Sequence, residues 1–310
     1  MSTFTYAPAK WVPFQDRAVI ERVRAISRKD ITRHPNPNFR IAVIADDEVE
    51  FLWLTDMFWR IKTAAEEGRR VVMIVPQPVP AYRKLASLIN RFHVSCGHLH
   101  TFNMDEYADE RGRIAPLDWK PGFGHAMLEN FYGRIDEGLR PAREQIHCFT
   151  DQNLSAYGRM MEDLGGVDIC YSGPGWTGHL AFLEPDAPEL DLPLEEWKKV
   201  GPRVVALSPF TIAQNSLSGP FGSAGDLAAV PPRAATIRPA QVIAARHRID
   251  FSAITVGGSF VSWQRFMTRL AAHGPVTPRV PTSIHQLLRT DYYISETVAA
   301  DITPDWEHIY

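Results

Sequence analysis

The stretch Val167–Pro185 constrains the fold more than any other part of the chain, because an apolar run passes there directly into a glycine-rich turn. The run Val167–Tyr171 is rich in β-forming residues and is expected to be a buried strand. The glycine-rich turn then presents His179 and Glu184. A strand that ends in this way places side chains at the carboxyl edge of a sheet, where open α/β proteins bind ligands. The stretch therefore predicts an α/β fold with a functional site at that edge.

A second strand also ends in ionisable side chains. His98–Met104 has the composition of a strand, and Asp105 and Glu106 follow it directly. A glycine-proline turn on its own is equally typical of a plain strand-to-helix connection. Two strands that each deliver ionisable groups at their carboxyl ends favour one shared cleft instead.

The first part of the chain alternates between strands and helices. Arg40–Ala45 and Val71–Val75 read as strands, and Val49–Glu67 and Ala81–Phe92 read as helices. This alternation predicts a Rossmann-like, doubly wound, mainly parallel sheet with helices on both faces. We expect one domain over residues 1–310, in which residues 1–38 form an N-terminal extension whose role the sequence leaves open.

Other segments are assigned from periodicity and turn residues. The expected helices are Asp16–Arg28, Gln152–Leu164, Ser259–Ala272 and Tyr292–Ala299. The later strands are expected at Val204–Leu207 and Ser252–Val256. Pro76–Pro80 reads as a rigid turn, and the polar loop Asp109–Gly124 is a candidate lid because it follows Asp105 closely.

Composition excludes several classes of protein. A net charge of −3 gives no general attraction to nucleic acid or to acidic membranes. Three cysteines, at irregular positions, do not make a disulfide framework. Because we see neither a secretory signal nor an apolar run long enough to cross a bilayer, we expect a cytoplasmic protein.

Two motifs together resemble a known family. The sequence FNMDEY, at Phe102–Tyr107, and the pattern GxGxxGHxAFxEP, at Gly173–Pro185, are similar to those of the glucosamine-6-phosphate deaminases. That family belongs to a larger group with the 6-phosphogluconolactonases and the ribose-5-phosphate isomerases. The resemblance is convincing from about Val94 to Pro185. It implies aldose–ketose isomerisation of an amino sugar with release of ammonia, no metal or organic cofactor, a small-molecule sugar as partner and a homo-oligomeric assembly.

The resemblance also assigns catalytic roles. Asp105 matches the base that moves a proton between C1 and C2 of the sugar. His179 matches the residue that opens the sugar ring, and Glu184 matches the acid that holds its imidazole in one tautomer. Each also has a structural interpretation: Asp105 could cap a turn, His179 could be a satisfied core histidine, and Glu184 could be a solvated loop acid.

The expected substrate-binding residues surround these three. We expect them to contact the sugar from the glycine turn, from the end of the second strand and from the loop after the first strand. Glu106 is weighed as more structural than catalytic. The residues are Asp46, Asp47, Glu106, Gly173, Gly175, Trp176, Thr177 and Gly178.

Departures from the family pattern concern the phosphate. Where the family has a small glycine-rich loop that binds a phosphate at a helix N-terminus, this chain has Asp46, Asp47 and Glu48. Such acids would repel a phosphate, although helix capping explains them equally well. Two basic positions of the family fall on Leu217 and Val261. We therefore expect the phosphate pocket to be lost and the substrate to be non-phosphorylated.

The sequence leaves three hypotheses about function open, namely the deaminase or isomerase described above and two alternatives. Thr177 stands where the family has an acid, which leaves ring opening and catalytic competence in question. The alternatives are a sugar lactonase of the same superfamily, with His179 activating water, and a non-catalytic sugar-binding or regulatory protein. The histidines and cysteine between His93 and His100 could form a metal site, but no second ligand cluster stands at a recognised spacing.

Overall fold

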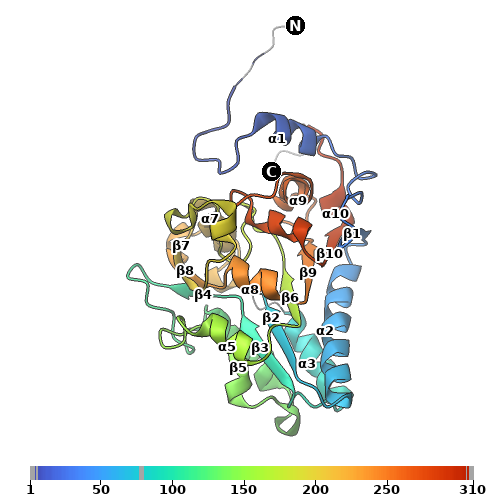
Figure 1. The fold of residues 1–310 in the computed structure, drawn as a ribbon, viewed down its shortest axis with the longest axis vertical. Coiled ribbons are helices and arrows are strands. Elements are labelled where there is room, and N and C mark those ends of the chain that lie inside the picture. Colours follow the sequence, from blue (N-terminus) through green and yellow to red (C-terminus); the bar gives the residue numbers. More distant parts are fainter. Residues whose placement is uncertain (1–3, 5, 77–79, 305, 307–310) are drawn as a thin grey trace.

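The computed structural model describes residues 4, 6–76, 80–304 and 306. Its centre is a seven-stranded sheet in which all paired neighbours run parallel. Figure 1 shows this sheet with helices packed on either side. In order across the sheet, the strands are β1 (Phe39–Ile44), β10 (Thr290–Ser295), β9 (His247–Ser252), β6 (Ile169–Ser172), β2 (Val71–Val75), β3 (Leu99–Asn103) and β5 (Ile146–His147).

The side chains of β2 explain why both faces are covered. Val71, Met73 and Val75 point into one core cluster, whereas Val72 and Ile74 point into another, as the alternation of a strand requires. A parallel strand buried on both faces is typical of a sheet between two helical layers. The first cluster packs against α2 (Glu48–Glu66), α3 (Ala81–Arg91) and α4 (Phe123–Asn130), and the second against α5 (Tyr157–Asp163) and α8 (Pro239–Ala244). The predicted doubly wound α/β fold is confirmed.

A second, smaller sheet lies beside the first and was not predicted. Its antiparallel strands are β4 (Asp105–Ala108), β8 (Arg233–Thr236) and β7 (Arg203–Ala206). The short helix α6 (Leu194–Trp197) precedes β7, and α7 (Pro209–Ser216) follows it. Because β4 begins almost where β3 ends, Asp105 lies at the junction of the two sheets, paired with Thr236.

The N-terminal segment packs against the C-terminal helices. In α1 (Arg17–Arg24), Val23 is fully buried in a cluster with residues of α9 (Gln264–His273). Arg22 Nη2 donates a hydrogen bond of 2.9 Å to the carbonyl oxygen of His273. Ile31 is buried with Val298 of α10 (Glu296–Ala299) in a further cluster. Residues 17–31 therefore contribute to the hydrophobic core.

Several predicted boundaries are wrong. The strand expected over Ser252–Val256 is β9, which ends at Ser252, and the helix expected over Tyr292–Ala299 is the end of β10 followed by the single turn α10. Polar residues interrupt both strands and hide their apolar pattern. Helices α1, α5 and α9 are shorter than expected. Of the expected turn Pro76–Pro80, residues 77–79 lie outside the described residues.

All three cysteines are buried and free. Burial raises the pKa of the Cys96, Cys148 and Cys170 thiols to about 12, so these groups stay protonated and inert near neutral pH. Within the described ranges, no helix combines the length and the apolar character needed to cross a membrane.

Candidate active site

A cavity of about 510 Å³ opens beyond the carboxyl ends of β2 and β6. These strands are neighbours, and the chain passes from β2 to β3 on one side, whereas after β6 it forms β7 and β8 of the smaller sheet and returns to this sheet at β9, on the other side of β6. Such a switch of direction is where open α/β sheets bind their ligands. The cavity wall includes Pro76 after β2, Ser172 and Gly173 at the end of β6, and Ile254 after β9.

Acidic side chains line the cavity on two sides. Asp46 and Glu50 line it from the α2 side, and Asp105 and His179 line it from the other. Among the described residues of the wall, none is Lys or Arg. Glu50 is in addition paired with Lys84, which is not part of this wall.

Asp105 combines exposure to the cavity with nearly complete burial from solvent. Its Oδ1 accepts a hydrogen bond of 3.0 Å from the backbone N–H of Phe182. Burial raises the pKa of its carboxyl to about 7, although hydrogen bonds from Thr236 and Phe182 act in the opposite direction. A carboxyl group with such a pKa can accept and return a proton near neutral pH.

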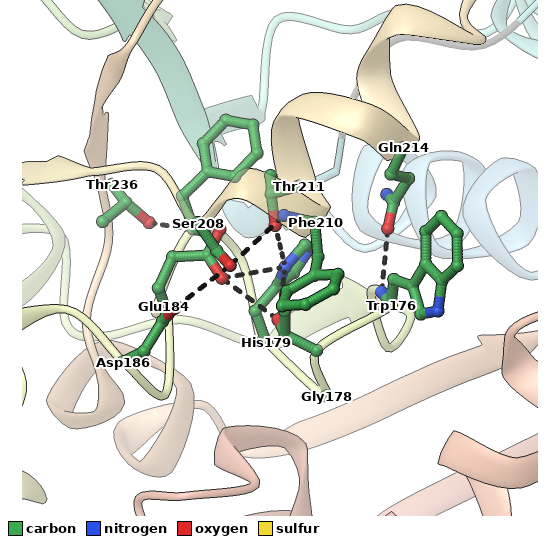
Figure 2. A network of polar contacts seen from close by, with 12 residues as sticks. Trp176, Gly178, His179, Glu184, Asp186, Ser208, Phe210, Thr211, Gln214 and Thr236 are labelled. Carbon is green, nitrogen blue, oxygen red and sulfur yellow. Dashed lines mark hydrogen bonds and ion pairs between the residues drawn. The ribbon is translucent and has the colours of Figure 1, made fainter. Parts of the chain in front are cut away.

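His179 is held from one side of its ring. Its Nδ1 lies 2.9 Å from Thr211 Oγ1 on α7 and 3.1 Å from Thr177 Oγ1. The other ring nitrogen, Nε2, lies close to Gly175, where an added Cβ would be 1.9 Å away from it. Figure 2 shows His179 at the centre of this network, between Glu184 and Thr211. The two threonines thereby hold the ring at Nδ1, whereas Nε2 lies on the side of Gly175, a residue of the cavity wall.

Glu184 reaches His179 partly through Thr177. The Thr177 hydroxyl donates a 3.0 Å hydrogen bond to Glu184 Oε2, which lies 3.5 Å from His179 Nδ1. Having donated its proton, the Thr177 oxygen can accept one from Nδ1–H. This pattern favours the tautomer in which Nε2 carries the free lone pair. Thr177 thus joins the histidine to its carboxylate, although its side chain does not line the cavity.

The glycines of the turn have steric reasons to be glycine. Gly173 and Gly175 line the cavity. A Cβ at Gly173 would lie 2.6 Å from the Phe251 carbonyl oxygen, and one at Gly175 would displace the His179 ring. Gly178 has a φ of +79° and lies outside the cavity wall. The glycine turn therefore allows the backbone to approach the His179 imidazole closely.

The two aspartates before α2 occupy different positions. Asp46 lines the cavity, and it also accepts hydrogen bonds from the backbone N–H and the hydroxyl of Thr297, the latter at 3.0 Å. Asp47 is at the N-cap position of α2 but makes no side-chain capping bond, and it does not line the cavity. Asp46 therefore joins the segment before α2 to α10. Asp47 was expected to contact the sugar, but it does not line the cavity.

Glu106 points away from the cavity and holds α4. Its carboxylate accepts hydrogen bonds from the backbone N–H groups of Tyr107, Phe123 and Gly124, at 2.9, 3.1 and 2.7 Å. Phe123 and Gly124 are the first residues of α4, whose N-terminal N–H groups have no partner within the helix. Glu106 does not line the cavity, and its carboxylate oxygens are bonded to the backbone, as its structural interpretation requires.

Several exposed apolar residues considered in the sequence analysis are not part of the cavity wall. Trp176 is 41% exposed and lies next to the cavity rather than in its wall. Leu217 and Val261 are exposed as well. Of the candidate lid Asp109–Gly124, only Phe123 lines the cavity, so this loop does not cover it in the described structure.

Sequence reasoning missed a buried polar cluster beneath the cavity wall. Ser172 lines the cavity, and its Oγ donates a hydrogen bond of 2.8 Å to Asp250 Oδ2. His285 Nε2 lies 3.2 Å from the same carboxylate oxygen. Asp250 and His285 come from distant strands and turns, and no motif joins them to Ser172. Thr211, which contacts His179, was missed for the same reason.

A metal site is not found in the described part of the chain, where no three His, Cys, Asp or Glu side chains are placed to hold an ion. His100 and His147 stack with ring centroids 5.8 Å apart. Burial lowers the pKa of both imidazoles, that of His147 to about 4, so both are neutral at physiological pH.

Comparison with known proteins places these observations in a family context. No protein-family profile matches the chain. The glucosamine-6-phosphate deaminase of Caenorhabditis elegans is 31% identical over 196 residues, which is 60% of this chain and 65% of that protein. The glucosamine-6-phosphate deaminase of Rhodopirellula baltica is 30% identical over 230 residues, covering 73% of this chain and 80% of that protein.

Solved structures resemble this fold over most of its length. A monomeric glucosamine-6-phosphate deaminase aligns with a TM-score of 0.67 and 19% identity, covering 84% of this chain and 98% of that one. The 6-phosphogluconolactonase of Trypanosoma cruzi aligns with a TM-score of 0.58 and 16% identity, covering 88% and 99%. At these identities the likeness concerns the fold.

Proposed function

The chain belongs to the glucosamine-6-phosphate deaminase family, and from this premise we propose that it is an enzyme that isomerises and deaminates a non-phosphorylated amino sugar. The observation that carries the proposal is the cavity itself. Asp105 and His179 share it with two further acids, and no Lys or Arg occurs among its described lining residues. Asp105 and His179 support proton transfer to and from the sugar, and the acidic charge of the wall supports a non-phosphorylated substrate.

The reaction begins with opening of the sugar ring. His179 Nε2 takes the proton of the anomeric hydroxyl and delivers it to the ring oxygen, so the bond between C1 and the ring oxygen breaks and an aldehyde forms. Thr177 and Glu184 hold Nδ1 during this exchange. The imidazole starts and ends the step neutral, which suits a ring whose Nδ1 side is already bonded.

Asp105 then moves a proton from C2 to C1. Its carboxylate removes the C2 proton while the substrate's own ammonium group passes a proton to the C1 carbonyl oxygen, which gives a neutral enolamine. Return of the proton from Asp105 to C1 produces an iminium ion at C2 and regenerates the carboxylate. Water adds to this iminium ion and ammonium leaves, so a 2-amino aldose becomes a 2-ketose. The raised pKa of Asp105 supports both directions of proton transfer.

Asp46 and Glu50 account for the choice of an uncharged sugar bearing an amine. Both line the cavity on the side of α2. Both carboxylates are solvent-exposed, and Glu50 is paired with Lys84, so Asp46 is the acid left to attract an ammonium group and to repel a phosphate dianion. We therefore propose that these residues replace phosphate recognition with recognition of a cationic or hydroxyl-rich ligand.

The test measures ammonia release from glucosamine and from glucosamine 6-phosphate. We expect turnover of glucosamine with little turnover of its phosphate ester, and a loss of about 10²–10⁴-fold in kcat for Asp105→Asn. Asp118→Asn changes an exposed aspartate of the neighbouring loop and is the matched control. Efficient deamination of glucosamine 6-phosphate would contradict the proposed loss of the phosphate pocket.

A second candidate is a lactonase acting on a sugar lactone. Thr177 stands two residues before His179, so no carboxylate is available at that position, while His179 Nε2 still faces the cavity side. In this alternative His179 activates water to attack the lactone carbonyl. Base consumption with sugar lactones, without ammonia release from amino sugars, would favour it. Ligand binding without any turnover would instead favour a sugar-binding protein.

We further propose that residues 1–310 form one domain, because α1 shares a hydrophobic cluster with α9. The partner required by the proposed reaction is a small sugar. Whether copies of the chain associate is a prediction for sedimentation measurements, and the exposed Phe51 and Trp59 on α2 are the residues to substitute.

A further inference from the structure

Four aromatic side chains form a continuous group at the rim of the cavity, which we call the aromatic platform. It consists of Trp176, Trp263, Phe210 and Trp11. The Trp176 and Trp263 rings are stacked, with centroids 5.5 Å apart and planes at 18°. Phe210 lies 6.4 Å from Trp176, and Trp11 lies 5.2 Å from Phe210. Residues from the turn, from α7, from the start of α9 and from the N-terminal segment thus meet on one surface.

The platform is accessible although its members touch one another. Trp176 is 41% exposed and Trp11 is 64% exposed. Isolated exposed apolar residues are normal on protein surfaces, whereas a contiguous aromatic group beside a cavity indicates a binding surface. Aromatic rings also provide flat faces that pack against a ligand ring with little loss of side-chain freedom.

Direct contacts join the platform to the cavity. The backbone N–H of Trp176 donates a 2.8 Å hydrogen bond to Gln214 Oε1, and Gln214 lines the cavity, as does the preceding Gly175. Figure 2 shows Trp176 beside Gln214, with Phe210 nearby on α7. Gln264 fixes the other side, because its Nε2 donates to the Pro174 carbonyl and its Oε1 accepts from Ile254 N–H. A ligand in the cavity can therefore extend onto the platform.

The size of the cavity supports a ligand larger than one sugar ring. Its volume of about 510 Å³ lies in the range of roughly 300–1,000 Å³ that accommodates drug-sized molecules. A single amino sugar would leave part of this space to water. The aromatic side chains at the rim would then stay hydrated, and they would contribute no binding free energy through burial.

We propose that the platform binds a second sugar ring attached to the amino sugar, so that the substrate is an oligosaccharide with a glucosamine-type residue at its reducing end. This inference rests on the proposed function. The reaction needs C1, the C2 amine and the ring oxygen of the reacting residue to be free, so the second ring must be linked through another hydroxyl, such as that on C4. Its C–H face would pack on the exposed indole of Trp176.

The test compares glucosamine with its β-1,4-linked disaccharide. Binding is followed by calorimetry and by tryptophan fluorescence, and turnover by ammonia release. We expect the disaccharide to bind about threefold to tenfold more tightly than glucosamine, as one stacked ring contributes. Trp176→Ala should remove this advantage, and Trp11→Ala, outside the glycine turn, should reduce it. Trp59→Ala, an exposed tryptophan on α2, is the control that should leave the ratio unchanged.

Each outcome separates the two proposals. Equal affinity for the two sugars, or an advantage that survives both platform variants, overturns the second-ring proposal even if glucosamine is deaminated. Tighter binding of the disaccharide that depends on Trp176, without ammonia release, supports the platform and contradicts the proposed reaction. Tighter binding of a benzyl ether of glucosamine than of the disaccharide overturns the assignment of a sugar ring.

Discussion

Asp105 shows how a single residue acquires a pKa suited to its proposed role. It begins β4 immediately after the chain leaves β3, and this junction buries its carboxyl group. Burial raises the pKa to about 7, while the Thr236 hydroxyl, the Phe182 N–H and the nearby His179 side chain lower it. Because the residue lines the cavity, we expect its ionisation to govern the proposed catalysis and ligand binding.

The first prediction concerns the pH dependence of turnover. Only ionised Asp105 can remove a proton from carbon, so kcat/KM should rise as the pH increases through about 7. Thr236→Val removes a hydrogen bond that lowers the pKa of Asp105, so it should move this limb to higher pH. The measurement is a pH–rate profile of both proteins. An unshifted limb in an active variant would exclude Asp105 as the group that titrates.

A second prediction at this scale concerns Gly175. An added methyl group would lie 1.9 Å from His179 Nε2, so Gly175→Ala must displace the imidazole. A misplacement of about 1 Å can cost about 10²-fold in rate, and we expect a loss of this size in kcat. Gly201→Ala is the control, because a methyl group there would meet no atom within 4 Å. Wild-type turnover by Gly175→Ala would show that the ring position is not critical.

At the scale of elements, α4 depends on a carboxylate from another strand. Glu106 in β4 accepts three backbone hydrogen bonds, two of them from the first turn of α4. A negative charge at that end also interacts favourably with the helix dipole. The side chain therefore fixes the end of the 109–122 loop and the position of Phe123, which lines the cavity.

Glu106→Ala should consequently destabilise the protein. It leaves buried N–H groups without acceptors, and we expect the free energy of unfolding to fall by about 3 kcal/mol. Denaturant unfolding measures this change, and Glu110→Ala, on the exposed part of the same loop, provides the control. A change below about 0.5 kcal/mol, which is ordinary for a surface substitution, would contradict the role given to Glu106.

How far sequence predicts these elements depends on which side chains they bury. β2 is apolar throughout, and its predicted limits agree with the structure. β9 contains the buried Arg248, whose Nη1 donates to the carbonyl oxygens of Val242, Ile243 and Ala245. A buried arginine whose donors are satisfied by carbonyl groups of the preceding turn, and by that of Arg289, has the same letter in the sequence as a surface arginine. The strand was therefore not placed from its apolar pattern.

The same reasoning applies to the candidate site. Asp105, His179 and Glu184 stand in contiguous motifs, so their shared location could be predicted. The contacts of Ser172 and of the platform could not, because Asp250 lies on β9 and the platform combines residues from α7, from the start of α9 and from the N-terminal segment. Contacts between such distant segments follow only from the three-dimensional packing, and no local spacing encodes them.

At the scale of the whole molecule, two adjacent buried acids make stability depend on pH. Burial raises the pKa of both Asp105 and Glu106 to about 7, well above the ordinary values of their side chains. Between about pH 4 and pH 7 the folded protein therefore binds more protons than the unfolded chain. The free energy of unfolding should consequently fall as the pH rises through this window, and these two groups should add no further change above it.

The corresponding prediction uses Asp105→Asn, which cannot ionise. The wild type loses stability when its buried carboxyl ionises, and the variant does not. The free energy of unfolding of the variant minus that of the wild type should therefore be larger at pH 8 than at pH 5. Denaturant unfolding at the two pH values tests this. An equal difference in stability at both values would show that Asp105 does not contribute to the pH dependence.

The burial of Cys96, Cys148 and Cys170 has a practical consequence for labelling. With thiol pKa values of about 12, none of them competes for a maleimide dye at neutral pH while the protein is folded. A cysteine introduced at an exposed position would therefore be the thiol that reacts, and the native cysteines would not have to be replaced first. Trp11→Cys would place a fluorophore beside Phe210, where its emission could report occupancy of the rim in real time.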